Sequence, residues 1–222
     1  MARRRSGPKR QAGFANRLVV MAKSPVLGRI KRRLSGDIGE VAALRFYRTC
    51  LAHTLLRLTR DKRWRCLVAV APDCDVAARL SPSLGRLARL PQGAGDLGRR
   101  MQRIFDRLPP GPVVIVGGDI PALSPRHVAD AFRRLGNADA AFGQASDGGY
   151  WLVGMKRVPK VPKPFANVRW SSPHALADTL ANLQGNRIAY AATLSDVDTG
   201  SDLRRQRNVS GRLILGSNPQ RD

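Results

Sequence analysis

Cysteine and histidine are both scarce in this 222-residue chain, which has three of each. The cysteines form neither an even set nor a C-x-x-C pair, so neither a disulfide framework nor a zinc site is predicted. The histidines have no metal-ligand spacing, and the sequence contains neither G-x-S-x-G nor a Cys/His nucleophile pattern. These absences argue against the common hydrolase chemistries. The few cysteines favour a reducing, cytoplasmic compartment.

Long hydrophobic runs are also missing. The longest, such as residues 18–22 and 113–116, are far shorter than the ~18 residues of a membrane-spanning helix. We therefore expect no membrane span. The five apolar residues at 18–22 are also too few for the apolar core of a signal peptide, which again favours the cytoplasm.

Acidic residues are few. The chain has 16 Asp and Glu but 39 Lys and Arg, which gives a net charge of +23. Such a charge is typical of nucleic-acid binders. However, 32 of the basic residues are Arg, and they are spread along the whole chain instead of clustering on one element. We interpret non-specific nucleic-acid adhesion, carried by basic arms, as a side property. The positive electrostatic field of the chain also suits phosphorylated or nucleotide substrates.

The length and the hydrophobic content of 43% predict one domain, which we place at residues 18–206. Residues 1–17 carry six basic side chains and no acid, which predicts a disordered arm. Residues 207–222 predict a loose basic tail.

Short β-rich runs alternate with segments of helical period inside that domain, a pattern typical of an α/β fold with a mostly parallel mixed sheet flanked by helices. A helix is predicted at 39–60, where Val41, Leu44, Leu51, Leu55 and Leu58 recur at helical spacing. Ser124-Pro125 and Ser172-Pro173 are typical helix starts. The predicted strands are 18–22, 66–71, 113–117, 138–143, 150–154 and 187–191.

Ligands of such sheets bind beyond the carboxyl ends of the strands, so the polar segments there are the candidate sites. The loop after the first strand combines Gly28 with five cations, namely Lys23, Arg29, Lys31, Arg32 and Arg33. Backbone N–H groups and these cations together suit a di- or triphosphate. The loop lacks the P-loop pattern, and a solvated basic loop is the alternative.

Acidic residues follow two other predicted strands. Asp119 lies between Gly118 and Ile120-Pro121, and Asp196 and Asp198 follow the last strand. Carboxylates at strand ends suit a hard divalent cation that also binds substrate phosphate, so the three acids could form one metal site. The alternatives are a turn or cap role for Asp119 and capping of the last helix by Asp198 and Thr199.

Two glycine-containing segments complete the candidates. Asp147 precedes Gly148 and Gly149, a pattern that allows close backbone approach but is also a common hairpin turn. Gly95 and Asp96 precede a predicted helix, where Asp96 could simply complement the helix dipole.

Six motifs in this order resemble the radical-SAM/selenodomain-associated transferases, a bacterial glycosyltransferase-like family with some members linked to arsenosugar biosynthesis. The resemblance spans about residues 16–205. It rests on the segments Ala22-Lys23-Ser24-Pro25 to Arg33-Leu34, Leu90-Pro91-Gln92-Gly93 with Gly95-Asp96-Leu97-Gly98, Gly117-Gly118-Asp119-Ile120-Pro121-Ala122-Leu123, Asp147-Gly148-Gly149-Tyr150, Trp170-Ser171-Ser172-Pro173 and Asp196-Val197-Asp198-Thr199.

The resemblance implies a GT-A nucleotide-diphospho-sugar transferase fold, which is Rossmann-like. It implies that Asp119 and Asp198 hold a divalent cation, Mg²⁺ or Mn²⁺. Asp147 is our candidate for acceptor orientation or base catalysis. The remaining implied roles are nucleotide and phosphate binding by Lys23, Gly28, Arg29, Lys31, Arg33, Gly95 and Asp96, and an acceptor side lined by Gly148, Gly149, Tyr150, Trp170, Ser171 and Ser172.

The chain departs from the family pattern at three places. Arg32 stands where Thr is common, Gly118 where Ser or Thr is common, and Gly200-Ser201 where Pro-Glu is common. The first two lie in the expected nucleotide and metal loops, so they bear on nucleotide affinity.

The sequence therefore predicts a metal-dependent transferase with a nucleotide-activated donor, foremost a glycosyltransferase that uses a nucleotide sugar and an unknown small-molecule acceptor. The alternative is a nucleotidyltransferase that uses an NTP and releases pyrophosphate. A third hypothesis is a non-catalytic basic binding protein.

Overall fold

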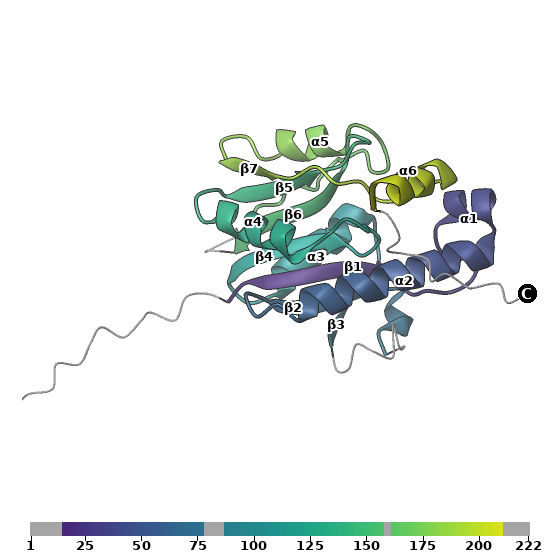
Figure 1. The fold of residues 1–222 in the computed structure, drawn as a ribbon. Helices are drawn as coiled ribbons and strands as arrows, with labels where there is room; N and C mark the ends of the chain where they lie inside the picture. The colour runs from purple at the N-terminus through teal and green to yellow at the C-terminus, as the bar shows by residue number, and fades with distance from the viewer. Residues whose placement is uncertain (1–14, 78–86, 158–160, 211–222) are drawn as a thin grey trace, which may run out of the picture.

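The computed structural model describes residues 15–77, 87–157 and 161–210 (Figure 1). The strands are β1 (Arg17–Lys23), β2 (Arg65–Ala71), β3 (Ala88–Pro91), β4 (Gly111–Gly117), β5 (Ala140–Gln144), β6 (Tyr150–Arg157) and β7 (Ile188–Ala191). The helices are α1 (Arg32–Ile38), α2 (Glu40–Thr59), the 3-10 turn η1 (Asp73–Asp75), α3 (Leu97–Arg107), α4 (Pro125–Leu135), α5 (Ala175–Ala181) and α6 (Gly200–Ser210).

The strands form one sheet in the order β3-β2-β1-β4-β6-β5-β7. Strand β6 pairs antiparallel with β4 and β5, and the other neighbouring strands pair in parallel. All strands but β6 therefore end at one edge of the sheet, which we call the carboxyl edge. This confirms the predicted single α/β domain with a mostly parallel mixed sheet.

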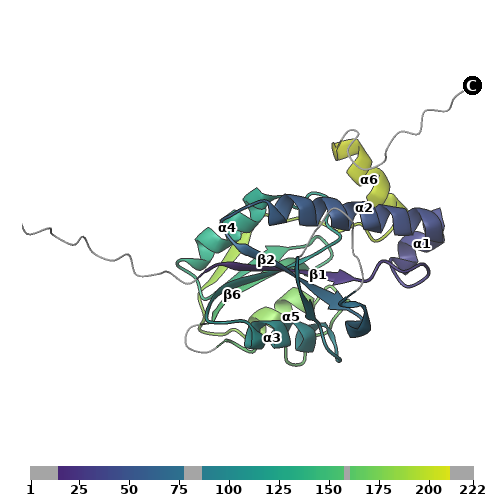
Figure 2. The same ribbon diagram turned by 90° about the horizontal axis from the view of Figure 1, so that it is seen from below.

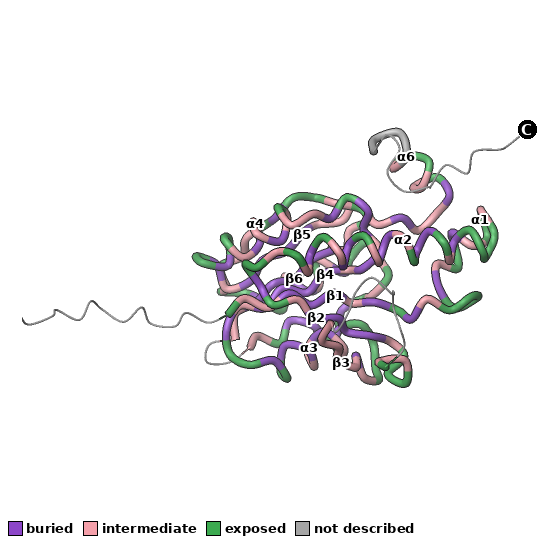
Figure 3. The backbone as a smooth tube through the Cα atoms, turned by 60° about the horizontal axis from the view of Figure 1, so that its bottom comes forward, coloured by how far each residue is buried: buried purple, intermediate pink, exposed green. Residues whose placement is uncertain are grey.

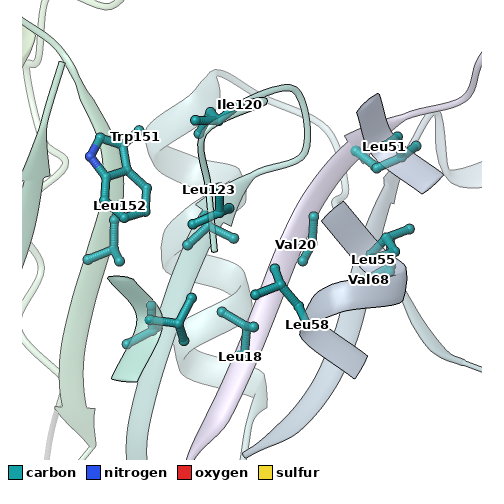
Figure 4. Packing of buried hydrophobic residues seen from close by; sticks show 14 of the residues in the cluster. Leu18, Val20, Leu51, Leu55, Leu58, Val68, Ile120, Leu123, Trp151 and Leu152 are labelled. Atoms are coloured by element: carbon teal, nitrogen blue, oxygen red, sulfur yellow. The ribbon is translucent and has the colours of Figure 1, made fainter. Parts of the chain in front are cut away.

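Helices cover both faces of the sheet, as Figure 2 shows with α2 and α4 on one side and α3 and α5 on the other. Side chains alternate along each strand, so Leu18 and Val20 pack toward α2, while Val19 packs toward α3. Figure 4 shows the first group beside Leu55 and Leu58 of α2. Strands β1, β2, β4, β5 and β6 each contain a run of buried residues, whereas the edge strands β3 and β7 are mostly half-buried (Figure 3).

The predicted strands are all present, with bounds that differ by a few residues. Strand β3 was not predicted because its four residues, Ala-Arg-Leu-Pro, contain no β-branched side chain and pair only with β2. The helix at 39–60 is confirmed as α2, although Val41 is exposed and does not belong to its buried face.

Of the two predicted helix starts, Ser124-Pro125 is confirmed, since Ser124 precedes α4 and Pro125 is its first residue. The start at Ser172-Pro173 is wrong, because α5 begins at Ala175. Ser172 Oγ instead accepts the N–H of His174 at 3.2 Å, which forms a separate turn before the helix.

The arm expected at 1–17 and the tail expected at 207–222 lie largely outside the described residues. Residues 15 and 16 lead into β1, which begins at Arg17, and 207–210 continue the backbone of α6. None of the helices in the described part of the chain combines the length and the apolar character that a bilayer crossing requires.

Candidate active site

Three carboxylates meet at the carboxyl edge, as predicted from their positions after strands. Asp119 follows β4, and Asp196 and Asp198 lie between β7 and α6. One oxygen from each lies within 4.8 Å of the others. All three side chains are partly exposed, so the cluster is accessible from solvent.

Lys31 lies among these carboxylates, and its side chain is only 6% exposed. Its Nζ is 2.6 Å from Asp119 Oδ2, 2.7 Å from Asp198 Oδ1 and 3.6 Å from Asp196 Oδ2. The residue stands just before α1 in the left-handed region, with φ of 45°, which is uncommon for a side chain other than glycine. The backbone thus adopts a costly conformation at the residue whose ammonium enters the acidic cluster.

The cluster changes the protonation of its members. Burial disfavours the ammonium of Lys31, but Asp119 and Asp198 outweigh it, so the pKa of Lys31 is raised. Burial also acts to raise the pKa of Asp198, but the charge and hydrogen bond of Lys31 lower it overall. Asp196 lies farther from the ammonium, and burial raises the pKa of Asp196 to about 6. Lys31 therefore stabilises the anionic form of Asp198, while Asp119 and Asp198 stabilise the ammonium of Lys31.

Asp198 is positioned by the start of α6. Asp202 accepts the N–H of Thr199 at 2.9 Å and that of Asp198 at 3.3 Å, and Thr199 Oγ1 accepts the N–H of Asp202. Thr199 and Asp202 therefore cap the helix reciprocally. Of the two residues whose capping was the alternative interpretation, Thr199 caps α6, whereas the Asp198 side chain binds Lys31.

Two of the three departures from the pattern of the resembled family lie at positions with specific contacts in the structure. The N–H of Gly200 donates to Asp37 Oδ2 at 2.7 Å, a bond from α6 to α1 that proline could not make. A Cβ on Gly118 would meet Leu51 Cδ1 at 2.8 Å, so this position faces the core beneath α2. Arg32, the third departure, is exposed at the start of α1.

The loop after β1 is held at its base and open at its tip. Tyr47 Oη accepts the N–H of Lys23 at 2.8 Å and donates to its carbonyl at 2.9 Å. The Ser24 N–H donates to the Ala71 carbonyl of β2. The side chains of Lys23, Arg29 and Arg33 are exposed, and Gly28 adopts φ of 72°. Sequence reasoning missed Tyr47, because nothing in a helical pattern distinguishes a core tyrosine from one that fixes a loop.

The segment after β3 lies next to this loop. Gln92 Nε2 donates to the carbonyls of Ala22 in β1 and Ala69 in β2, at 3.1 and 2.8 Å. Asp96 caps α3 by accepting the N–H of Arg99, which is the alternative considered for it. The Gly95 carbonyl accepts from Arg100. Arg103, which was not predicted, donates to the carbonyls of Gln92 and Ala94.

The segments expected on the acceptor side also meet. Gly148 lies in the turn between β5 and β6, and its carbonyl accepts the N–H of Leu176 in α5 at 3.1 Å. The rings of Tyr150 and Trp170 meet edge to face with centroids 6.3 Å apart. Ser171 adopts φ of 58°, a second strained position at this edge.

Asp147 forms the hairpin turn that was its alternative interpretation, since its Oδ1 accepts the N–H of Gly149 at 3.0 Å. The turn lies beside the acidic segment, because Ser146 Oγ is 2.8 Å from Ser195 Oγ, next to Asp196. The exposed Asp147 carboxylate is therefore at the same edge as the cluster.

The cluster fits a divalent cation. Carboxylate oxygens are the ligands that Mg²⁺ and Mn²⁺ take in proteins, and the ammonium of Lys31 shows that positive charge is stabilised at this point. Asp119, Asp196 and Asp198 are the residues that would hold the ion.

Solved structures share this fold over most of the chain. A protein from Desulfovibrio desulfuricans G20, provisionally named a nucleotide-diphospho-sugar transferase, matches with a TM-score of 0.79 and 28% identity, covering 90% of this chain and 92% of that chain. The 4-diphosphocytidyl-2C-methyl-D-erythritol synthase of Anaerococcus prevotii DSM 20548 matches with a TM-score of 0.58, 10% identity and coverage of 88% and 97%. CMP:2-keto-3-deoxy-manno-octonic acid synthetase complexed with CTP matches with a TM-score of 0.52, 15% identity and coverage of 88% and 98%.

The last two similarities establish the fold alone, and together with the first they confirm the expected nucleotide-diphospho-sugar transferase fold. A comparison with curated proteins found no significant match. A family model matches residues 54–172, more than half of the chain, and includes Asp119, Asp147 and Trp170. The chain therefore belongs to DUF2064, a family described as uncharacterized proteins conserved in bacteria.

Proposed function

We propose that this protein is a divalent-metal-dependent transferase that uses a nucleotide-activated donor, and that the donor is a nucleotide sugar. The observation that carries the proposal is the cluster of Asp119, Asp196 and Asp198 at the carboxyl edge, beside a loop with exposed cations. The similarity to the D. desulfuricans protein supports it. The radical-SAM association and the arsenosugar link, implied only by the motif resemblance, stay predictions.

The donor side consists of two loops. Lys23, Arg29 and Arg33 bind the diphosphate oxygens, and the Gly28 loop and the segment at Gly95 and Asp96 provide backbone contacts. Asp119 and Asp198, with Asp196, hold the cation, Mg²⁺ or Mn²⁺. When bound, the cation supplies charge stabilisation for the leaving nucleoside diphosphate.

The acceptor side is formed by the turn between β5 and β6 and by the segment before α5, whose Trp170 lies against Gly98 of α3. Gly148, Gly149 and Tyr150 from the hairpin, with Trp170, Ser171 and Ser172, line it. Asp147 accepts the proton of the acceptor hydroxyl as the oxygen attacks the sugar carbon and the bond from that carbon to the diphosphate breaks. The acceptor is a small molecule.

Nucleotidyl transfer is the second candidate. The loop after β1 offers enough cations for a triphosphate as well as a diphosphate. In that reaction a phosphorylated acceptor attacks the α-phosphorus of an NTP, and pyrophosphate leaves.

Titration of UDP-, GDP-, ADP- and TDP-sugars and of the four NTPs, each with and without Mg²⁺ or Mn²⁺, tests the proposal. We expect one nucleotide sugar to raise the melting temperature only with metal, because a ligand that binds only the folded state stabilises it by about 2.7 kcal/mol at a hundredfold excess over Kd. Metal-dependent preference for an NTP, with pyrophosphate release, would establish nucleotidyl transfer instead. No metal-dependent binding by any of these ligands would favour the non-catalytic binding protein.

A further inference from the structure

Lys31 differs from the other cations of its loop. Lys23, Arg29, Arg32 and Arg33 are exposed, as expected of side chains that meet a ligand arriving from solvent. Lys31 has a side chain that is 6% exposed, and its ammonium is directed into the acidic cluster. In this structure it therefore neutralises the protein's own carboxylates.

The ammonium and a divalent cation would use the same oxygens. Nζ lies 2.6 Å from Asp119 Oδ2 and 2.7 Å from Asp198 Oδ1, while the ligand atoms of the three carboxylates lie within 4.8 Å of one another. A Mg²⁺ ion binds carboxylate oxygens at ~2.0–2.1 Å. A cation held by Asp119 and Asp198 would therefore overlap the position of Nζ, and two cations so close would repel each other.

We propose that Lys31 is an exchangeable internal cation, which occupies the acidic cluster in the metal-free protein and is displaced from it when a divalent cation binds. The proposal rests on the metal site of the proposed function. Because Lys31 belongs to the phosphate-binding loop, its ammonium becomes available to the donor phosphates only after displacement. Metal binding thereby prepares the loop for the donor, which orders the two binding events.

The exchange predicts that removing the ammonium strengthens metal binding. In Lys31→Met a metal ion no longer competes with two short, charge-assisted hydrogen bonds, so Mn²⁺ measured alone by calorimetry should bind about tenfold more tightly or better. Arg32→Met is the matched control, because it removes one positive charge from the adjacent exposed side chain. We expect its Mn²⁺ affinity to stay within about twofold of the wild-type value.

The outcomes distinguish a failure of the exchange from a failure of the proposed metal site. Tighter binding in Lys31→Met alone supports the exchange. Equal or weaker Mn²⁺ binding in Lys31→Met than in the wild type overturns the exchange but leaves the metal site. If neither the wild-type protein nor Lys31→Met binds Mn²⁺, the metal site is overturned, and the exchange with it.

A second measurement uses the wild-type protein and does not depend on the variant's folding. Lysine acetylation by a water-soluble reagent, followed by mass spectrometry, reports whether each ammonium is accessible. We expect Lys31 to react slowly without metal and several-fold faster with saturating Mg²⁺, while exposed Lys23 changes little. Continued protection of Lys31 in the Mg²⁺-bound protein would overturn the proposal.

Discussion

Asp119→Asn is expected to lower Mn²⁺ affinity by about 100-fold or more and to remove the metal-dependent part of nucleotide binding. The amide keeps the shape of the carboxylate but loses its charge and one anionic ligand. The fold should be retained, since Asp119 is partly exposed and Lys31 keeps its 2.7 Å contact with Asp198. Calorimetric titration with Mn²⁺, and then with nucleotide in the presence of Mn²⁺, gives both affinities.

Asp139→Asn provides the control for this prediction. It removes the same charge from a residue that precedes β5, at the opposite edge of the sheet, where Asp139 pairs with Arg187. Its Mn²⁺ and nucleotide affinities should equal those of the wild type. Wild-type affinity in Asp119→Asn would remove Asp119 from the metal site.

Gly148→Ala is expected to lower the free energy of unfolding more than the other proposed substitutions. A Cβ at this position would lie 2.2 Å from the carbonyl oxygen of Pro173, and the residue has φ of +83°. The left-handed conformation costs alanine about 1–2 kcal/mol, and the clash with backbone adds about 1–3 kcal/mol. The two contributions together amount to about 2–5 kcal/mol, and at roughly 2–4 °C per kcal/mol for a chain of this size Tm should fall by about 4–20 °C.

Gly185→Ala separates the two contributions. Gly185 has φ of +80°, but no atom lies within 4 Å of the position that a Cβ would take there, so only the conformational cost applies. Its Tm should fall by no more than about 2–8 °C. Equal falls in Tm for the two variants would show that the hairpin is not packed against the Pro173 segment as described.

The fold could be predicted from the sequence where local pattern and burial agree. The apolar runs of β1 and β4 are buried on both faces, and a β-rich run without charges indicates that environment directly. Strand β3 could not be predicted, because pairing with β2 makes it a strand and its own residues do not. The start of α5 was misplaced because Ser172 forms a turn of its own two residues too early.

The candidate site, like the fold, was predicted only in part from the sequence. The acidic residues were found because the carboxyl ends of parallel strands meet at one edge, a rule that needs only the strand positions. The insertion of Lys31 among them depends on a left-handed backbone conformation before α1. The neighbouring residues in the sequence do not indicate this conformation. Likewise, Gly118 was expected to bear on the metal loop, yet its missing side chain would point at Leu51 of α2.

The most direct test of the account is a crystal structure with Mn²⁺ and pyrophosphate, the group common to nucleoside diphosphates, in which anomalous scattering locates the metal. The account predicts one Mn²⁺ bound by Asp119 and Asp198, with pyrophosphate contacting both the metal and the cations of the loop after β1. Mn²⁺ bound away from these carboxylates, or pyrophosphate bound away from the carboxyl edge, would contradict it.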